Sequence, residues 1–84
     1  MNAKYLVVHT YLYLRNTKEY NRPGWRSIVT EYPEWILAHS KMREDFAASV
    51  KSGVCVATFD CDSAYIETET GEKEIWTITQ WKEG

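Results

Sequence analysis

The residues best suited to chemistry are two histidines, two cysteines and the carboxylates around one of the cysteines. His9 and His39 could each act as a general base, but local spacing places no acid or nucleophile beside either of them. Cys61 lies between Asp60 and Asp62, whose negative charges disfavour the reactive thiolate. We therefore expect no catalytic residue, and we expect that the chain is not an enzyme.

Cofactor and metal motifs are missing from the sequence as well. Asp60 and Asp62 begin like a calcium-binding loop, but Ala64 and Ile66 follow at alternate positions, and Gly71 stands where the closing Glu belongs. The sequence has no Gly-rich phosphate loop, zinc-spaced Cys/His cluster or nucleophile elbow. We expect neither a cofactor nor a metal.

The two cysteines, Cys55 and Cys61, are predicted to be free thiols. Six residues of extended chain span about 20 Å, which is far beyond the reach of a disulfide. From the alternation of its strand, we expect Cys55 to be a small buried side chain.

Size and composition predict a single domain covering residues 1–84. The 84 residues have a formal net charge of −2 and are 44% hydrophobic, so the core should be one shallow layer. The longest apolar stretch, residues 5–14, has about half of the roughly 20 residues that span a bilayer. The first residues lack the pattern of a secretion signal, and we expect a cytoplasmic location.

The hydrophobic pattern predicts an α+β fold. Strands are expected at residues 4–14, 54–59, 64–69 and 73–81, a loop at 15–26, a short helix of one or two turns at 25–32, and the main helix at 33–51. The predicted order is β-α-β-β-β, a two-layer sandwich in which one main helix covers one face of a mainly antiparallel sheet. Gly71 should take the left-handed turn position that sets Glu67 opposite Lys73.

The predicted core is the contact between the main helix and one face of the sheet. The helix stripe is Trp35, His39, Met42, Phe46 and Val50, and the sheet residues expected beneath it are Leu6, Val8, Leu12, Cys55, Ala57, Phe59, Ile66, Trp76 and Ile78. We expect His39 to pack its ring at the rim of this core.

The opposite sheet face is predicted to be rich in aromatic and aliphatic residues. Its members are Tyr5, Val7, His9, Tyr11, Tyr13, Val54, Val56, Tyr65, Ile75 and Trp81. Monomers seldom expose a large apolar patch, and Tyr and Trp are enriched at binding hot spots. This pattern predicts a protein-binding surface or a homodimer interface, in which we include Tyr5, His9, Tyr11, Tyr13, Tyr65, Ile75 and Trp81. In the alternative interpretation, the segment carrying Tyr20 or Trp25 covers this face and makes it ordinary core.

Charge is segregated along the chain. Residues 1–43 contain seven Lys/Arg and three Asp/Glu, whereas residues 44–84 contain three and nine. Glu67 and Glu69 lie in the most acidic part, a hairpin that could occupy the basic groove of a nucleic-acid-binding enzyme or complex. In the alternative interpretation this hairpin is only solvated, and its charges prevent aggregation through the sheet edge.

A second candidate function is binding of single-stranded nucleic acid. Basic and aromatic residues lie together in the predicted loop, next to the tyrosine-rich strand at residues 4–14, a combination that holds single strands: Arg15, Lys18, Tyr20, Arg22, Trp25 and Arg26. The net negative charge argues against this function.

In size and general character the chain resembles the small phage-encoded inhibitors of host enzymes, among them the anti-CRISPR proteins. The resemblance implies a non-enzymatic viral protein that binds a larger partner, such as a host defence enzyme, and acts by occlusion in the host cytoplasm. A small bacterial regulatory protein or toxin–antitoxin component fits the same features.

Overall fold

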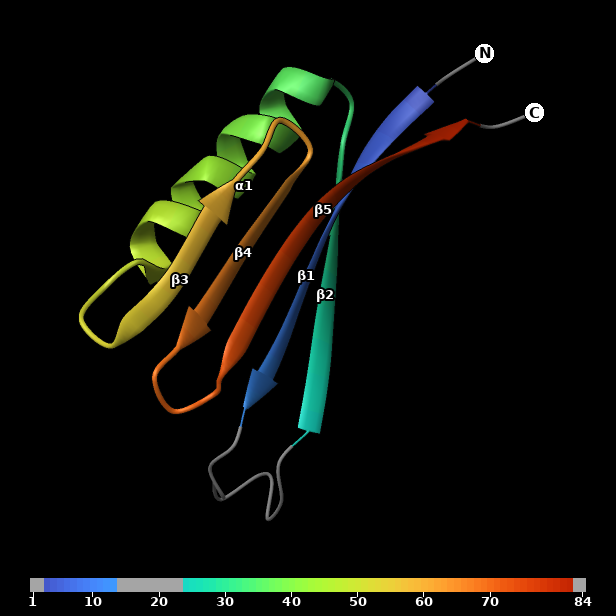
Figure 1. The fold of residues 1–84 in the computed structure, drawn as a ribbon. Helices are drawn as coiled ribbons and strands as arrows, with labels where there is room; N and C mark the ends of the chain where they lie inside the picture. The colour runs from blue at the N-terminus through green and yellow to red at the C-terminus, as the bar shows by residue number, and fades with distance from the viewer. Residues whose placement is uncertain (1–2, 14–23, 83–84) are drawn as a thin grey trace.

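The sheet and the helix form two layers (Figure 1). The computed structural model describes residues 3–13 and 24–82. Its elements are β1 (Ala3–Tyr13), β2 (Gly24–Tyr32), α1 (Trp35–Ser49), β3 (Val54–Phe59), β4 (Ser63–Thr68) and β5 (Lys73–Lys82). The five strands lie in the order β2-β1-β5-β4-β3, and every neighbouring pair is antiparallel. The predicted α+β sandwich with one main helix is thus confirmed.

Residues 24–32 form a strand, so the prediction of a short helix at residues 25–32 was wrong. The spacing of Trp25, Ile28, Val29 and Tyr32 fits a helix turn, but it does not exclude a strand. The run Ile28-Val29-Thr30 is β-branched, and such residues favour extended backbone. Pairing with β1 over residues 24–32 then adds a fifth strand at the edge of the sheet.

The core lies between α1 and the central strands. Ala38 and Met42 of α1 are fully buried, and their neighbours in the buried cluster are Val7, Ala64, Ile66 and Trp76. Phe46 and Phe59 extend this contact, with ring centroids 5.2 Å apart. His39 stacks on Trp35 with centroids 4.6 Å apart and lies edge-on to Phe59, at the rim as expected.

The face of β1 that covers the core was predicted wrongly. Val7 lies opposite Ile78 and His9 lies opposite Trp76, so the odd-numbered residues of β1 share a face with the buried residues of β5. Leu6, Val8 and Leu12 consequently lie on the other face. Both alternating sets of β1 are apolar, so the pattern could not show which set is buried; the pairing register decides this.

Two smaller predictions concern the C-terminal hairpins. Gly71 has φ 90° and Glu67 lies opposite Lys73, as expected. Cys55 is exposed instead of buried, because the pairing register between β3 and β4 shifts between Val54 and Val56 and breaks the alternation at Cys55. Both cysteines are free, as predicted.

Candidate interaction surface on the open face of the sheet

The side of the sheet that points away from α1 is called the open face here. In Figure 1, β3 passes in front of α1, so the open face of β3 and its neighbour β4 is turned toward the viewer. The pairing registers assign to it Lys4, Leu6, Val8, Thr10 and Leu12 of β1; Trp25, Ser27, Val29 and Glu31 of β2; Val56 and Thr58 of β3; Ser63, Tyr65 and Glu67 of β4; and Lys73, Ile75, Thr77, Thr79 and Trp81 of β5. Within the described part of the chain, no helix or strand lies over this face.

Two exposed tryptophans mark the ends of the open face. Trp25 pairs with Leu12 at one end of β1, and Trp81 pairs with Lys4 at the other. Their exposed fractions are 54% and 43%. The two positions are eight residues apart along β1, or about 27 Å at the usual rise of a strand. The face is therefore long enough to contact a macromolecule.

A shallow pocket lies beside Trp81. It has a volume of about 200 Å³ and is lined by Lys4, Leu6, Glu31 and Trp81. The Lys4 ammonium lies 3.4 Å from a Glu31 carboxylate oxygen and 4.9 Å from the centre of the Trp81 ring. Lys4 and Glu31 neutralise each other's charge at the rim of the pocket, while Leu6 and the indole ring of Trp81 form its apolar walls. A pocket of this kind suits one apolar side chain of a partner.

A second group of polar residues lies toward the other end of the open face. The Tyr65 hydroxyl donates a 2.8 Å hydrogen bond to Oε1 of Glu67, and the Lys73 ammonium lies 3.7 Å from the same oxygen. The hydrogen bond to Glu67, together with partial burial and the negative charge of Glu67, raises the pKa of Tyr65. Glu67 therefore already has two partners within the sheet, whereas Glu69 is exposed in the following turn.

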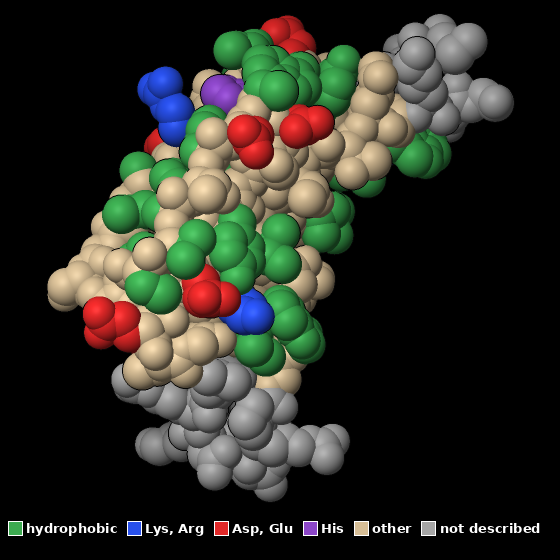
Figure 2. Space-filling model, in the orientation of Figure 1, with side chains coloured by type: hydrophobic (Ala, Val, Ile, Leu, Met, Phe, Trp, Pro, Cys, Tyr) green, Lys and Arg blue, Asp and Glu red, His purple; other side chains and the backbone are tan. Residues whose placement is uncertain are grey.

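Polar residues interrupt the apolar ones along the open face. The hydroxyls of Thr10 and Ser27 lie 3.0 Å apart across β1 and β2, and Thr77 and Thr79 continue the polar positions on β5. Figure 2 shows the result: hydrophobic side chains are separated by polar ones and by backbone, and one acidic and one basic side chain adjoin low on the sheet. Such a mixture is typical of the surfaces of non-obligate protein interfaces.

The predicted aromatic surface is divided between the two faces of the sheet. Tyr65, Ile75 and Trp81 lie on the open face, as does Val56. Tyr5, His9 and Tyr11 lie on the α1 side. The backbone of Tyr13 pairs with Gly24, and its side chain lies outside the described part of the structure. Val7 and Val54 also face the α1 side and pack in or against the core. The prediction of one surface combining all these residues was wrong, because the pairing register turns the β1 residues to the α1 side and the register shift in β3 does the same for Val54.

His9 lies on the α1 side and contacts the core. Its ring stacks on Trp76 with centroids 4.5 Å apart and planes 7° apart, and Tyr11 lies 5.4 Å away. His9 Nε2 is 3.9 Å from Oε2 of Glu74, and both atoms are buried without a hydrogen-bond partner. That separation is too long for a hydrogen bond. The arrangement packs aromatic rings together but does not form an acid–base pair.

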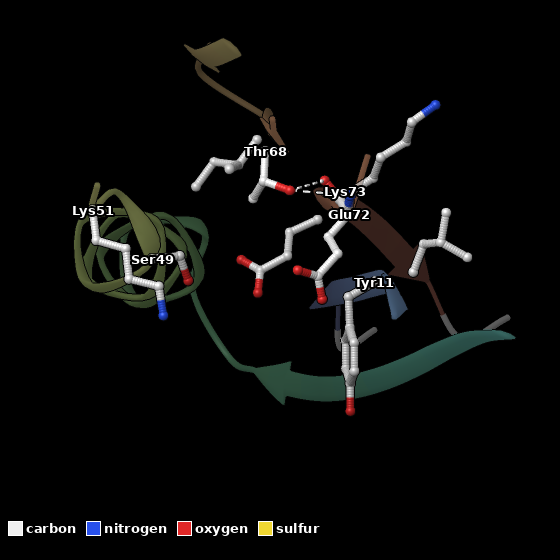
Figure 3. Close-up of a pocket in the computed structure, with 9 residues that line it drawn as sticks. Tyr11, Ser49, Lys51, Thr68, Glu72 and Lys73 are labelled. Atoms are coloured by element: carbon white, nitrogen blue, oxygen red, sulfur yellow. Dashed lines mark hydrogen bonds between the residues drawn. The ribbon is translucent and has the colours of Figure 1, made fainter. Parts of the chain in front are cut away.

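A cavity of about 300 Å³ lies on the α1 side, between the end of the helix and the sheet (Figure 3). Its walls are Tyr11, Leu12, Ser49, Lys51, Ile66, Thr68, Glu72, Lys73 and Glu74. The Thr68 hydroxyl accepts a 3.1 Å hydrogen bond from the backbone N–H of Glu72, which closes the turn beside the cavity. Lys51, Glu72 and Glu74 contribute charged side chains to these walls, whereas the ammonium of Lys73 lies beside Glu67 on the open face.

Most of the residues proposed for nucleic acid lie outside the described residues: Arg15, Lys18, Tyr20 and Arg22. The remaining two, Trp25 and Arg26, are exposed on β2 but point to opposite faces of the sheet. The geometry therefore does not join these two into one stacking platform.

Sequence reasoning missed several open-face residues, among them Lys4, Glu31 and Val29. Because residues 25–32 were predicted to form a helix, Val29 was not assigned to a sheet face. The β-branched run Ile28-Val29-Thr30 was a signal for a strand instead. The pairing of Lys4 with Glu31 needs β1 beside β2, a contact between residues 27 positions apart.

The described residues contain no group of three or more His, Cys, Asp or Glu side chains placed to hold a metal ion. In the same residues, no helix has the length and hydrophobicity needed to cross a membrane. Comparisons with models of known families, with curated protein sequences and with solved structures give no match.

Proposed function

We propose that the protein is a non-enzymatic protein-binding module that docks its open face on a larger protein and blocks part of that protein's surface. The observation that carries the proposal is the electrical neutrality of a long, aromatic-ended face. Its described charges are Lys4, Glu31, Glu67 and Lys73, which form two ion pairs. Trp25 and Trp81 stand at its two ends.

This charge balance favours a protein over a nucleic acid as the partner. A nucleic-acid surface must neutralise several phosphates and therefore carries an excess of Lys and Arg. On the open face each lysine already lies within 3.7 Å of a carboxylate oxygen. A protein surface of mixed polarity matches such a face, because aromatic anchors provide the affinity and paired charges at the rim provide orientation.

The mode of action that fits these features is occlusion, as in a small phage-type inhibitor of a host defence enzyme such as an anti-CRISPR protein. The open face extends over about 27 Å between its tryptophans, which is enough to cover the entrance of a substrate channel. The acidic turn residue Glu69 lies at the end of the β4–β5 hairpin and could enter a basic groove beside the docked face.

Matched tryptophan variants test the proposal. Tagged wild-type protein is used to capture partners from nuclease-treated bacterial lysate, and the captured protein is then titrated with Trp81→Ala, Trp25→Ala and Trp35→Ala. We expect the two open-face variants to weaken binding by about 2 kcal/mol or more. Trp35 is 36% exposed on α1, and its replacement should leave affinity unchanged.

Thermal unfolding of the same variants separates binding from folding. The open-face variants should unfold within a few degrees of wild type, because their side chains are half exposed. Equal loss of affinity with Trp35→Ala would contradict the proposal, and so would partners that are captured from untreated lysate but not from nuclease-treated lysate.

A further inference from the structure

The two edges of the sheet are built differently. β3 forms one edge with six residues, and its pairing is shifted between Val54 and Val56. β2 forms the other edge with nine residues that pair with β1 without a break. Irregular, short edges resist pairing with another chain, whereas long regular edges invite it. One edge is therefore protected, and β2 is open to pairing.

The side chains of β2 strengthen this difference. Ile28 is 52% exposed on the α1 side, and Trp25 and Val29 are 54% and 57% exposed on the open face. Among the described residues, no strand pairs with the outer edge of β2. Apolar side chains on both faces of a free, regular edge are what a sheet presents where another strand is added.

The sequence of β2 is complementary to itself. A two-fold axis perpendicular to the sheet joins two antiparallel strands, and an axis at Ile28, the middle residue of β2, pairs all nine residues of each copy. Ile28 then meets Ile28 of the second copy. Arg26 lies opposite Thr30, and Trp25 lies opposite Glu31, so no like charges face each other.

The position of α1 leaves room for this pairing. The helix follows β2 directly after Tyr32, and Tyr32 packs against the core, whereas Arg26 and Ile28 toward the other end of β2 are exposed. Figure 1 shows the lower part of β2 extending away from α1. Because the two strands run in opposite directions, the two helices lie near opposite ends of the joined edges and do not collide.

We propose that β2 pairs with β2 of a second copy about a two-fold axis at Ile28, so that two five-stranded sheets become one continuous sheet. The open faces of both copies then lie on the same side and stay exposed. The dimer does not depend on the proposed function, since it uses the edge of the sheet and leaves the open face free.

Sedimentation velocity tests the dimer directly. Wild-type protein should show a concentration-dependent monomer–dimer equilibrium. Ile28→Lys places two like charges opposite each other at the axis and should raise the dissociation constant by about 100-fold or more. Thr58→Lys makes the same kind of change on the exposed part of β3 and should leave the equilibrium unchanged. A wild-type monomer at millimolar concentration, or an Ile28→Lys dimer as stable as wild type, would overturn the proposal.

Disulfide trapping tests the register without relying on a destabilising charge. In a background of Cys55→Ser and Cys61→Ser, the variant Ile28→Cys brings two thiols face to face at the axis, within disulfide range. Thr30→Cys lies on the same face of the same strand, but its two copies are separated by about 13 Å along the edge. Mild oxidation should cross-link Ile28→Cys and not Thr30→Cys. Equal cross-linking of both, or of neither, would reject this interface.

Discussion

At the scale of single residues, Tyr65 reports on the electrostatics of the open face. Its hydroxyl donates to a carboxylate that also lies near Lys73. The raised pKa of Tyr65 means that the folded protein keeps the phenol proton at pH values where the unfolded chain begins to lose it. This contribution to stability is fully present below the ordinary tyrosine pKa of 10.0 and is lost as the pH rises through the higher pKa of the folded state.

We expect Glu67→Gln to lower the pKa of Tyr65 toward 10.0, because the change removes the negative charge beside the phenolate that forms. An NMR titration of the Tyr65 ring signals measures the shift. Glu69→Gln, two residues away in the turn, is the matched control and should leave the titration where it is in wild type. An unchanged titration in Glu67→Gln would mean that the 2.8 Å contact does not persist in solution.

The two neighbouring valines of β1 differ in burial, and this difference is testable by isosteric substitution. Val7 is 4% exposed in the core, whereas Val8 lies on the open face. Val7→Thr should lower the free energy of unfolding by about 1–3 kcal/mol, since it buries a hydroxyl. Val8→Thr should change it by less than about 0.5 kcal/mol. Urea denaturation of both variants compares them, and the reverse order would mean that β1 is paired one residue out of register.

At the scale of elements, two glycines allow the chain to reverse, one between the helix and the sheet and one between two strands of the sheet. Gly53 has φ 94° in the turn between α1 and β3, and Gly71 has φ 90° in the turn between β4 and β5. Residues with a Cβ seldom adopt such angles. A larger residue at either position would therefore meet strain in the backbone.

Gly53→Ala isolates this backbone effect, because a Cβ built at Gly53 meets nothing within 4 Å. We expect a loss of about 1 kcal/mol of unfolding free energy. Gly53→Asn should cost less, because Asn tolerates the left-handed region. Thermal unfolding measures both, and an alanine variant as stable as wild type would show that the turn can rearrange.

The elements also differ in how well their sequences predicted them. The helical period placed Met42 and Phe46 of α1 against the core, as predicted. It was wrong for Trp35 and Val50, which are exposed, and it missed the fully buried Ala38. For β2 two periods fitted the same residues, and the contact with β1 settles the choice. Whether a segment forms an edge strand depends partly on the strand that pairs with it. The hydrophobic period of the segment itself carries no information about that neighbour.

At the scale of the whole molecule, the distribution of charge along the sequence differs from the distribution of charge on the folded surface. The chain has a net charge of −2, and its acidic residues concentrate in the C-terminal half. The open face, which draws residues from both halves, is nevertheless neutral because Lys4 pairs with Glu31 and Lys73 pairs with Glu67. Net charge along the sequence thus does not describe the surface that we propose to bind.

Neutrality of the open face predicts weak salt dependence for binding of a protein partner. Between about 50 and 200 mM salt, we expect the dissociation constant to change by less than about threefold, because paired charges at a rim contribute little. A nucleic-acid ligand held by about 6–10 phosphate contacts would lose about 10³- to 10⁵-fold over the same range. Isothermal titration at several salt concentrations distinguishes the two, and a steep loss would direct attention to basic residues elsewhere in the chain.

The amino-acid sequence by itself was sufficient to predict the main helix, the three C-terminal strands and the turn at Gly71. Each of these depends on a local pattern: a stripe with the period of a helix, an alternation, or a glycine beside polar residues. The two faces of β1, by contrast, are both apolar over Leu6, Val7 and Val8. Their burial depends on the partner strands, since Val7 meets Ile78 only when β1 and β5 are in register. The composition of the open face, and with it the candidate site, follows from that long-range pairing.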